Sequence, residues 1–248
     1  MKISVVTVTM NDSPESLRRN IMALERQTYP CHEHIIVDSG IDRGIRSDVA
    51  GGRCIYCRCS PGGVYNAINY GMSKAHGDVI GLIHGNDCLG RDDALESVAR
   101  VFTEREDVGF VYSDVDFYKY GSDGSARMVR HYGASRFEPS MLTRGFAPPH
   151  PSLFIRREVA IAVGPYAEDY KVGADFEMWL RLFDPDRGLG YSYLPGTLVR
   201  MSSGGMSTKL SNVLSVNIKE KIKALRSHGF EASLFRLLTR YFYLINPK

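Results

Sequence analysis

The chain alternates short runs of hydrophobic residues with polar segments in which apolar positions recur at helical spacing. Val, Ile and aromatic residues dominate the apolar runs, which predicts strands buried on both faces. Between these runs, apolar residues three and four positions apart predict amphipathic helices. This rhythm indicates an α/β fold, with a mostly parallel twisted sheet flanked by helices. The predicted strands are residues 3–8, 33–38, 53–59, 79–84 and 108–118. One helix is predicted to begin after Ser13, a second lies within residues 61–78 and ends at Gly77, and a third begins at Asp92 or Asp93.

The second half of the chain is less regular. A short helix is predicted at residues 175–183, and one or two strands are predicted at residues 191–202. Two terminal helices are expected at 212–227 and 231–244, so we divide the chain into a domain of residues 1–207 and a helical tail of residues 208–248. The last helix mixes basic residues with aromatic and aliphatic ones. It could dock on the domain, pair two subunits or lie in a membrane interface.

The composition narrows the class of protein. The chain has 248 residues, 44% hydrophobic and 24% charged, with a formal net charge of +3. That charge is too small to indicate nucleic acid as a partner. No run of about 18 apolar residues predicts a membrane span, and the N-terminus reads as a strand rather than a signal peptide. We therefore expect a cytoplasmic protein with reduced cysteines.

Three acidic residues are the candidates for chemistry. Asp38 ends the second predicted strand, Asp87 follows the fourth, and Asp175 begins a helix, where a carboxylate also serves as a cap. The carboxyl ends of parallel strands share one edge of a sheet, where α/β folds bind ligands. Neither G-x-G-x-x-G nor G-x-x-x-x-G-K-[ST] follows the first strand, so a phosphate-bearing ligand would need another device, such as a divalent cation on Asp87.

A zinc site is a weaker interpretation of "CIYCRC". Cys54 and Cys57 fall in a predicted strand, where their odd spacing directs them to opposite faces. A structural zinc site usually shows two ligand pairs at defined spacings. We therefore interpret these residues as ordinary strand cysteines.

Six segments in order resemble the family 2 glycosyltransferases of the GT-A fold, near the bacterial exopolysaccharide and O-antigen enzymes. The resemblance covers roughly residues 1–207 and implies a Rossmann-like GT-A fold. It is specific for the family and not for the sugar. The segments are "ISVVTVTMND", "IIVDSG", "GGVYNAINYGMSKAHGDVIGLIHGND", "HPSLFIRREV" with "VGPY", "GADFEMWLRL" and "SSGGMS".

The resemblance also implies roles for individual residues. Asp175 would be the general base, Asp87 would bind Mn²⁺ or Mg²⁺, and Asp38 would hydrogen-bond the nucleotide base. Two positions depart from the family: Met10 stands where many members have Tyr, and Asn86 replaces an acid. The remaining nucleotide-binding residues would be Thr7, Thr9, Gly63, Asn66 and Asn86. The donor or acceptor site would include Tyr65, His150 and Trp179, although a tryptophan at this position is more typical of the core.

The expected function is inverting transfer of a sugar from a nucleotide-sugar donor, UDP-linked, to a hydroxyl of a glycan or lipid-linked glycan in polysaccharide biosynthesis of the bacterial cell envelope. Contact with the inner face of the membrane, or a dimer, would involve the C-terminal helices. A sugar-1-phosphate nucleotidyltransferase is one alternative, but "VTVTMNDSP" lacks the glycine-rich loop expected after its first strand. A non-catalytic nucleotide-sugar or glycan binder is the other, suggested by Asn86.

Overall fold

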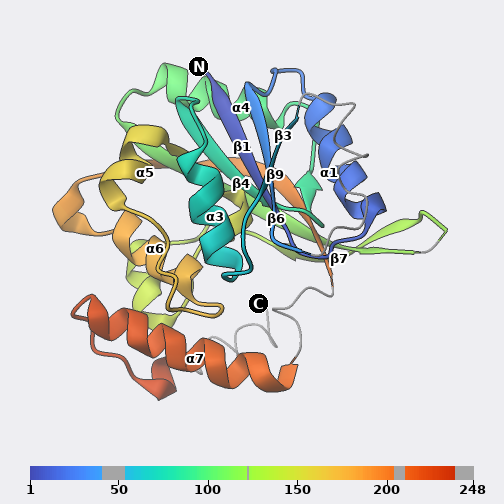
Figure 1. Cartoon of the computed structure of the whole chain (residues 1–248). Coiled ribbons are helices and arrows are strands. Elements are labelled where there is room, and N and C mark those ends of the chain that lie inside the picture. Colours follow the sequence, from blue (N-terminus) through green and yellow to red (C-terminus); the bar gives the residue numbers. More distant parts are fainter. Residues whose placement is uncertain (41–53, 122, 204–209, 238–248) are drawn as a thin grey trace.

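The computed structural model describes residues 1–40, 54–121, 123–203 and 210–237, which form a nine-stranded twisted sheet flanked by helices (Figure 1). The sheet has the order β3-β2-β1-β4-β8-β6-β9-β5, and β7 pairs with β6 outside this path. The strands are β1 Ile3–Thr9, β2 Glu33–Asp38, β3 Cys54–Arg58, β4 Val79–His84, β5 Cys88–Leu89, β6 Val108–Tyr120, β7 Ala126–Tyr132, β8 Phe154–Arg156 and β9 Gly190–Ser202.

Helices cover both faces of the sheet. Side chains of β1 alternate between two cores: Val6 and Val8 pack with α3 and α6, whereas Ile3 and Val5 pack with α1 and α4. This alternation follows from the two-residue period of a strand. The helices are α1 Pro14–Glu25, α3 Val64–Ser73, α4 Ala94–Glu104, α5 Arg157–Val163, α6 Ala174–Leu182 and α7 Leu210–Ser227, with short 3₁₀ turns η1 Pro139–Arg144, η2 His150–Ser152 and η3 Pro185–Arg187.

The half of the sheet that carries the predicted site is parallel. Strand β1 lies between β2 and β4 and runs parallel to both, and β2 runs parallel to β3. Thr9 stands opposite Asp38, and Val8 stands opposite His84. The carboxyl ends of β1, β2 and β4 therefore meet at one edge, as the sequence predicts.

The other half of the sheet is mixed. Strand β8 is antiparallel to both β4 and β6, and β6 is parallel to β9. Strands β5 and β7 add further antiparallel pairs. The predicted α/β sheet is thus confirmed. Strand β8 has three residues and β5 has two, too few for hydrophobic periodicity to predict them.

Two local expectations had different outcomes. Ser13 caps α1 as predicted, because its Oγ accepts a hydrogen bond from the amide of Ser16 over 3.2 Å. Helix α3, in contrast, ends at Ser73 rather than at Gly77. Gly77 instead allows a close approach to β1: its amide donates to Ser4 Oγ over 2.8 Å, and a Cβ there would lie 2.6 Å from that oxygen.

Helix α7 matches the first predicted terminal helix and lies beside α6 (Figure 1). Of the second, predicted at 231–244, residues 234–237 are helical, and the rest lies outside the described residues. The glycines of "SSGGMS" lie outside them as well. Within the described chain, every helix is too short or too polar to cross a bilayer.

Candidate functional site

Asp38 is fully buried at the carboxyl end of β2, where two groups of the protein hold its carboxylate. Its Oδ1 accepts a hydrogen bond from the amide of Gly40, and its Oδ2 accepts one from the hydroxyl of Tyr56, each over 2.8 Å. Tyr56 lies on β3, the neighbouring parallel strand. The structure thus fixes the orientation of this carboxylate from two sides.

Asp87 is buried in the turn that follows β4, with 3% of its surface exposed. Its Oδ1 accepts a hydrogen bond from the amide of Ser202 over 2.9 Å. Burial raises the pKa of Asp87 to about 7, and the neighbouring Asp12 carboxylate acts in the same direction. Its Oδ2 has no hydrogen-bond partner among the described residues. Within the described part of the chain, one oxygen of this carboxylate is therefore held by the protein and the other is not.

Asp12 joins this edge of the sheet and was not predicted from the sequence. The hydroxyl of Thr9 donates to its Oδ2 over 2.8 Å. Burial raises the pKa of Asp12, the Thr9 hydrogen bond opposes that rise, and the Asp38 carboxylate adds to it. The missed signal is a repeated dipeptide: Asn11-Asp12 follows β1 just as Asn86-Asp87 follows β4, and these strands are neighbours.

A buried network fixes the turn that carries Asp87. The Nδ2 of Asn20, on α1, donates to the carbonyl oxygens of Asp87 over 2.9 Å and His84 over 3.3 Å. Its Oδ1 accepts from the Thr7 hydroxyl over 3.2 Å, and that hydroxyl also lies 2.9 Å from Nε2 of His34. Thr7 is fully buried, so its hydroxyl belongs to this interior network, whereas Thr9 contacts Asp12 at the sheet edge.

Asp175 lies in the first turn of α6, partly exposed, with its Oδ1 accepting from the amide of Phe176 over 2.7 Å. The ring of Tyr65, at the start of α3, lies nearby and stacks on Tyr166 with centroids 6.1 Å apart. Burial raises the pKa of Tyr65, and the charges of Asp175 and Glu220 add to this effect. Two helices and the segment before α6 therefore converge at Asp175.

His150 connects the Asp87 turn with the Asp175 group. Its Nε2 lies 2.8 Å from the hydroxyl of Tyr166. Burial lowers the pKa of His150 to about 3, and the nearby His84 contributes to that shift. Burial raises the pKa of Tyr166 in turn, and the charge of Asp175 adds to that rise. A neutral imidazole is therefore packed between the end of β4 and the neighbourhood of α6.

Trp179 is 1% exposed and belongs to the aromatic core. Its ring meets that of His150 edge to face, with centroids 6.3 Å apart. Its Nε1 is buried and has no hydrogen-bond partner in the described chain. Trp179 thus supports His150 from the core side.

The glycine-rich loop before α3 approaches the segment ahead of α6. Gly63 is the N-cap of α3 with φ of 90°, a conformation that favours glycine. Asn66, one turn later, donates from Nδ2 to Oε2 of Glu168 over 3.2 Å. Asn86 is half-buried in the turn between His84 and Asp87. The predicted residues therefore lie in two groups, the Asp38 and Asp87 edge and the start of α3 with α6.

Within the described residues, no cluster of three or more His, Cys, Asp or Glu side chains forms a metal cage. The Sγ of Cys54 lies 3.2 Å from Nδ1 of His34, in the buried network. A divalent cation at this edge would therefore depend on Asp87 together with oxygens of a ligand.

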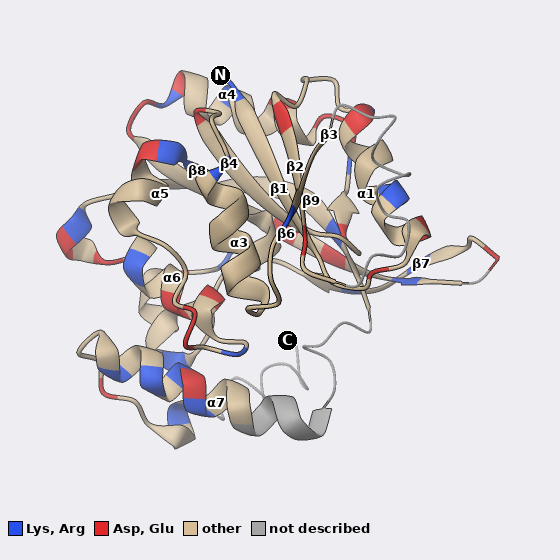
Figure 2. Ribbon diagram, viewed as in Figure 1, with Lys and Arg blue, Asp and Glu red and all other residues tan. Residues whose placement is uncertain are grey.

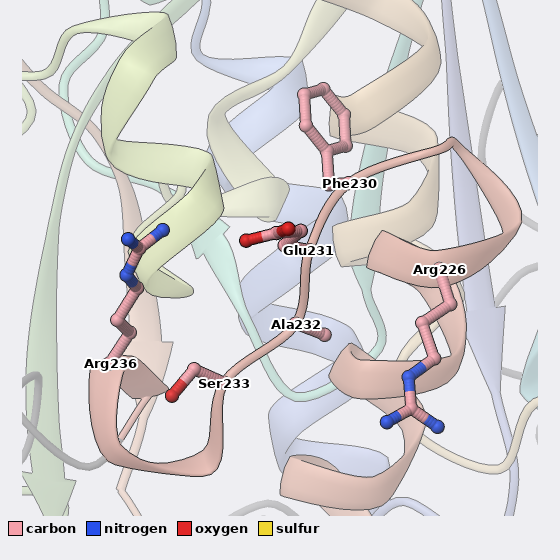
Figure 3. A pocket seen from close by; sticks show the side chains of 6 residues that line it. All are labelled: Arg226, Phe230, Glu231, Ala232, Ser233 and Arg236. Carbon is pink, nitrogen blue, oxygen red and sulfur yellow. The ribbon is translucent and has the colours of Figure 1, made fainter.

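A hollow of about 490 Å³ lies at the end of α7, away from the residues described above. Figure 3 shows Arg226 and Arg236 on opposite sides of it. None of the predicted site residues lines it, and its walls are Arg226, Phe230, Glu231, Ala232, Ser233 and Arg236.

Comparison with known proteins identifies the family of the chain. The family model described as Glycosyl transferase family 2 matches residues 4–162. An uncharacterized glycosyltransferase of Mycobacterium tuberculosis is 26% identical over 72% of this chain and 68% of its own length. A protein of Mycobacterium bovis named PGL/p-HBAD biosynthesis glycosyltransferase is 30% identical over 65% of this chain and 62% of its own length.

Solved structures resemble the whole chain. The crystal structure of Staphylococcus aureus TarS 1-349 in complex with UDP-GlcNAc has a TM-score of 0.69 at 14% identity, covering 100% of this chain and 76% of that one. Another TarS structure has a TM-score of 0.59, and this chain spans 46% of it. At this identity the likeness concerns the fold alone, and it confirms the predicted fold class.

Proposed function

The chain belongs to glycosyl transferase family 2, and we propose that it transfers a sugar, with inversion, from a UDP-linked donor to a hydroxyl of a glycan or lipid-linked glycan. That it is a glycosyltransferase follows from the family. The UDP donor is supported by TarS, whose structures are described as complexes with UDP-GlcNAc and with UDP. The acceptor class is supported by the name of the PGL/p-HBAD biosynthesis relative. A cytoplasmic location stays a prediction, and so does the alternative in which the C-terminal helices contact the inner face of the membrane.

The observation that most directly supports this function is the buried path from the Asp87 turn to Asp175. His84 precedes that turn and acts electrostatically on His150, the Nε2 of His150 lies 2.8 Å from the Tyr166 hydroxyl, and the charge of Asp175 adds to the effect of burial in raising the pKa of Tyr166. Sugar transfer needs charge stabilisation at the departing diphosphate and a base at the incoming hydroxyl. Two carboxylates on separate elements, connected by a rigid core, suit these two tasks.

The nucleotide would bind at the carboxyl edge of β1, β2 and β4. A carboxylate has about four acceptor sites, and two of those on Asp38 are used by Gly40 and Tyr56. A remaining acceptor site of this buried carboxylate would take an N–H of the base. The start of α3 after Gly63, with Asn66, would present backbone N–H groups to the diphosphate, and Asn86 and Thr9 would contact the nucleotide from the sheet edge. Thr7 would act indirectly, through Asn20.

A divalent cation, Mn²⁺ or Mg²⁺, fits the donor set. Such ions commonly use one or two carboxylates together with substrate phosphates. The available Oδ2 of Asp87 provides one such ligand. A cation would also offset the mutual repulsion of Asp87 and Asp12. When bound, it would neutralise charge on the departing diphosphate.

The acceptor side would depend on Asp175. Its carboxylate would accept the proton of the attacking hydroxyl in the transition state. Attack on the face of the anomeric carbon opposite the diphosphate inverts the configuration. Tyr65, Tyr166 and His150 would shape the pocket around the sugar, and Trp179 would hold His150 in place.

A panel of nucleotide sugars, assayed for slow hydrolysis and then for transfer, tests this function. We expect release of UDP that requires Mn²⁺ or Mg²⁺. In the Asp175→Asn variant, turnover should fall by about 10²- to 10⁴-fold, the usual contribution of a general base, while UDP affinity is retained. Undiminished turnover in that variant would refute the base assignment.

Two further assays separate the alternatives. Pyrophosphate release from UTP and a sugar 1-phosphate would indicate a nucleotidyltransferase. Metal-independent binding of UDP without donor hydrolysis would indicate a non-catalytic binder.

A further inference from the structure

Glu220, on helix α7, binds the backbone just before Asp175. Its Oε1 accepts a hydrogen bond from the amide of Lys171 over 2.8 Å, and its Oε2 accepts one from the amide of Val172 over 3.0 Å. Hydrogen bonds from backbone N–H groups to a carboxylate are about twice as strong as neutral ones. One side chain of the C-terminal helix thus fixes two consecutive peptide groups of the segment that leads into α6.

The next residue shows how closely α7 approaches. Gly173 is the N-cap of α6, and a Cβ at this position would lie 2.9 Å from Cβ and 3.0 Å from Oε2 of Glu220. The absence of a side chain therefore permits the contact. Asp175 follows two residues later, in the first turn of α6. Any shift of this segment relative to Glu220 would move the base.

Other contacts make α7 a fixed support. The Nζ of Lys221 is buried, donates to the carbonyl oxygen of Gly145 over 2.7 Å and lies 4.8 Å from the ring centre of Phe176. Directly after the end of α7, Nε2 of His228 lies 3.0 Å from Oε1 of Glu177. Figure 2 shows several blue turns and one red turn on α7, whose described part carries Lys219, Lys221, Lys223 and Arg226 and one acid, Glu220.

Glu220 is also close enough to the site to act on it electrostatically. Its charge contributes, together with that of Asp175, to the raised pKa of Tyr65. The Tyr65 hydroxyl therefore senses both carboxylates.

We propose that Glu220 is a positioning residue for Asp175, and that α7 completes the catalytic site instead of serving as a separate extension. The inference rests on the proposed function, in which Asp175 is the base. A displacement of about 1 Å in a reacting group costs up to about 10²-fold in rate. The loss of both Glu220 hydrogen bonds should act on turnover through Asp175, while the nucleotide edge of the sheet is left intact.

The test compares Glu220→Ala and Glu220→Gln in two backgrounds, wild type and Asp175→Asn. We expect Glu220→Ala to lower kcat by about 10-fold or more, with the Kd for UDP unchanged within about twofold. Glu220→Gln should lower kcat by a smaller factor, since its amide keeps one carbonyl oxygen as an acceptor. In the Asp175→Asn background neither change should reduce the residual rate further, because residues that act as a unit are non-additive.

The matched control is Lys223→Gln, on the same helix. Lys223 forms an exposed ion pair with Asp169, upstream of the Glu220 contacts, and its loss should leave kcat unchanged. Full kcat in both Glu220 variants beside an inactive Asp175→Asn would overturn the positioning role alone. An equal loss in both backgrounds, or weaker UDP binding with a lower Tm, would also overturn it by indicating general destabilisation. Full turnover of Asp175→Asn would instead refute the base assignment, and the positioning role with it.

Discussion

The backbone amide of Ser202 donates a hydrogen bond to Oδ1 of Asp87, joining the end of β9 to the turn after β4 over 2.9 Å. The two residues are 115 positions apart in the chain. The carboxylate proposed to bind the cation is thus oriented by a strand from the second half of the protein. An isosteric amide at position 87 keeps an oxygen for this contact and removes only the charge.

The Asp87→Asn variant should therefore fold normally and lose its response to metal. We expect transfer to fall by about 100-fold or more, because the ion would contribute several kcal/mol of charge stabilisation. Titration with UDP, with and without Mn²⁺, should give equal affinities in the variant and different ones in the wild type. Asp107→Asn, an exposed acid paired with Arg105, is the control. Retained metal dependence in Asp87→Asn would show that another residue binds the ion.

Tyr56→Phe should weaken UDP binding without altering the metal requirement. The variant removes the 2.8 Å hydrogen bond that fixes Oδ2 of Asp38. A hydrogen bond to a charged group contributes about 1.5–3 kcal/mol, so we expect affinity to fall by about 10-fold. Tyr29→Phe, whose hydroxyl bonds the carbonyl of Met1, is the control away from the site. Equal UDP affinity of both variants would contradict a role for Asp38 in base recognition.

Acid should destabilise the protein through its buried histidines. Burial lowers the pKa of His34 from 6.5 to about 4 and that of His150 from 6.5 to about 3. The unfolded chain therefore binds protons below pH 6.5 that the folded chain does not, and the free energy of unfolding falls as the pH decreases from 6.5 toward 4. Each histidine contributes about 1.4 kcal/mol per pH unit in this window.

Urea denaturation at several pH values measures this dependence. The His34→Gln variant should show a shallower slope than the wild type between pH 6.5 and 4, by about one proton. His76, an exposed histidine paired with Glu33, gives the control His76→Gln. An unchanged slope in His34→Gln would mean that His34 is protonated in the folded state.

Gly71→Ala should destabilise the protein although alanine is the better helix former. A Cβ at position 71 would lie 2.4 Å from Cγ1 of Val6 and 2.9 Å from Cγ2 of Val37. Overpacking of this kind costs about 1–3 kcal/mol, which exceeds the gain of about 1 kcal/mol from helix propensity. Thermal unfolding should show a lower Tm for Gly71→Ala and little change for the exposed Ser73→Ala. An increase in Tm for Gly71→Ala would contradict the close packing of α3 on the sheet.

The sequence predicts the long periodic elements of this fold well. Strands such as Ile3–Thr9 and helices such as Ala94–Glu104 carry enough residues for their period to be read. Strand β8 is too short for this, and its antiparallel insertion between β4 and β6 depends on tertiary pairing. The end of α3 differs from its prediction because Gly77 serves a contact with Ser4 rather than a helix terminus.

For the site, the sequence motifs identify candidate residues but not the direction in which their side chains point. Asp38 and Asp87 are predicted because they follow apolar runs, and the structure places them at one edge of the sheet. Thr7 occupies the same strand as Thr9, yet its side chain points into the buried network of Asn20 and His34. Glu220 carries no motif, since its importance lies in backbone amides 48 and 49 positions away. Contacts of this range arise only when the helices pack.

Strand β9 has a consequence for how the chain folds. It pairs with β6 and with β5. Residues 190–202 are therefore joined to residues 108–118 of β6 and to residues 88 and 89 of β5. Contacts between such distant residues slow folding, because a long loop must close before they form. The pairs β1–β2 (Ser4 with Glu33) and β2–β3 (His34 with Cys54) join residues much closer in the chain, so we expect these pairs to assemble early. Acquisition of activity during refolding should then lag behind the appearance of secondary structure.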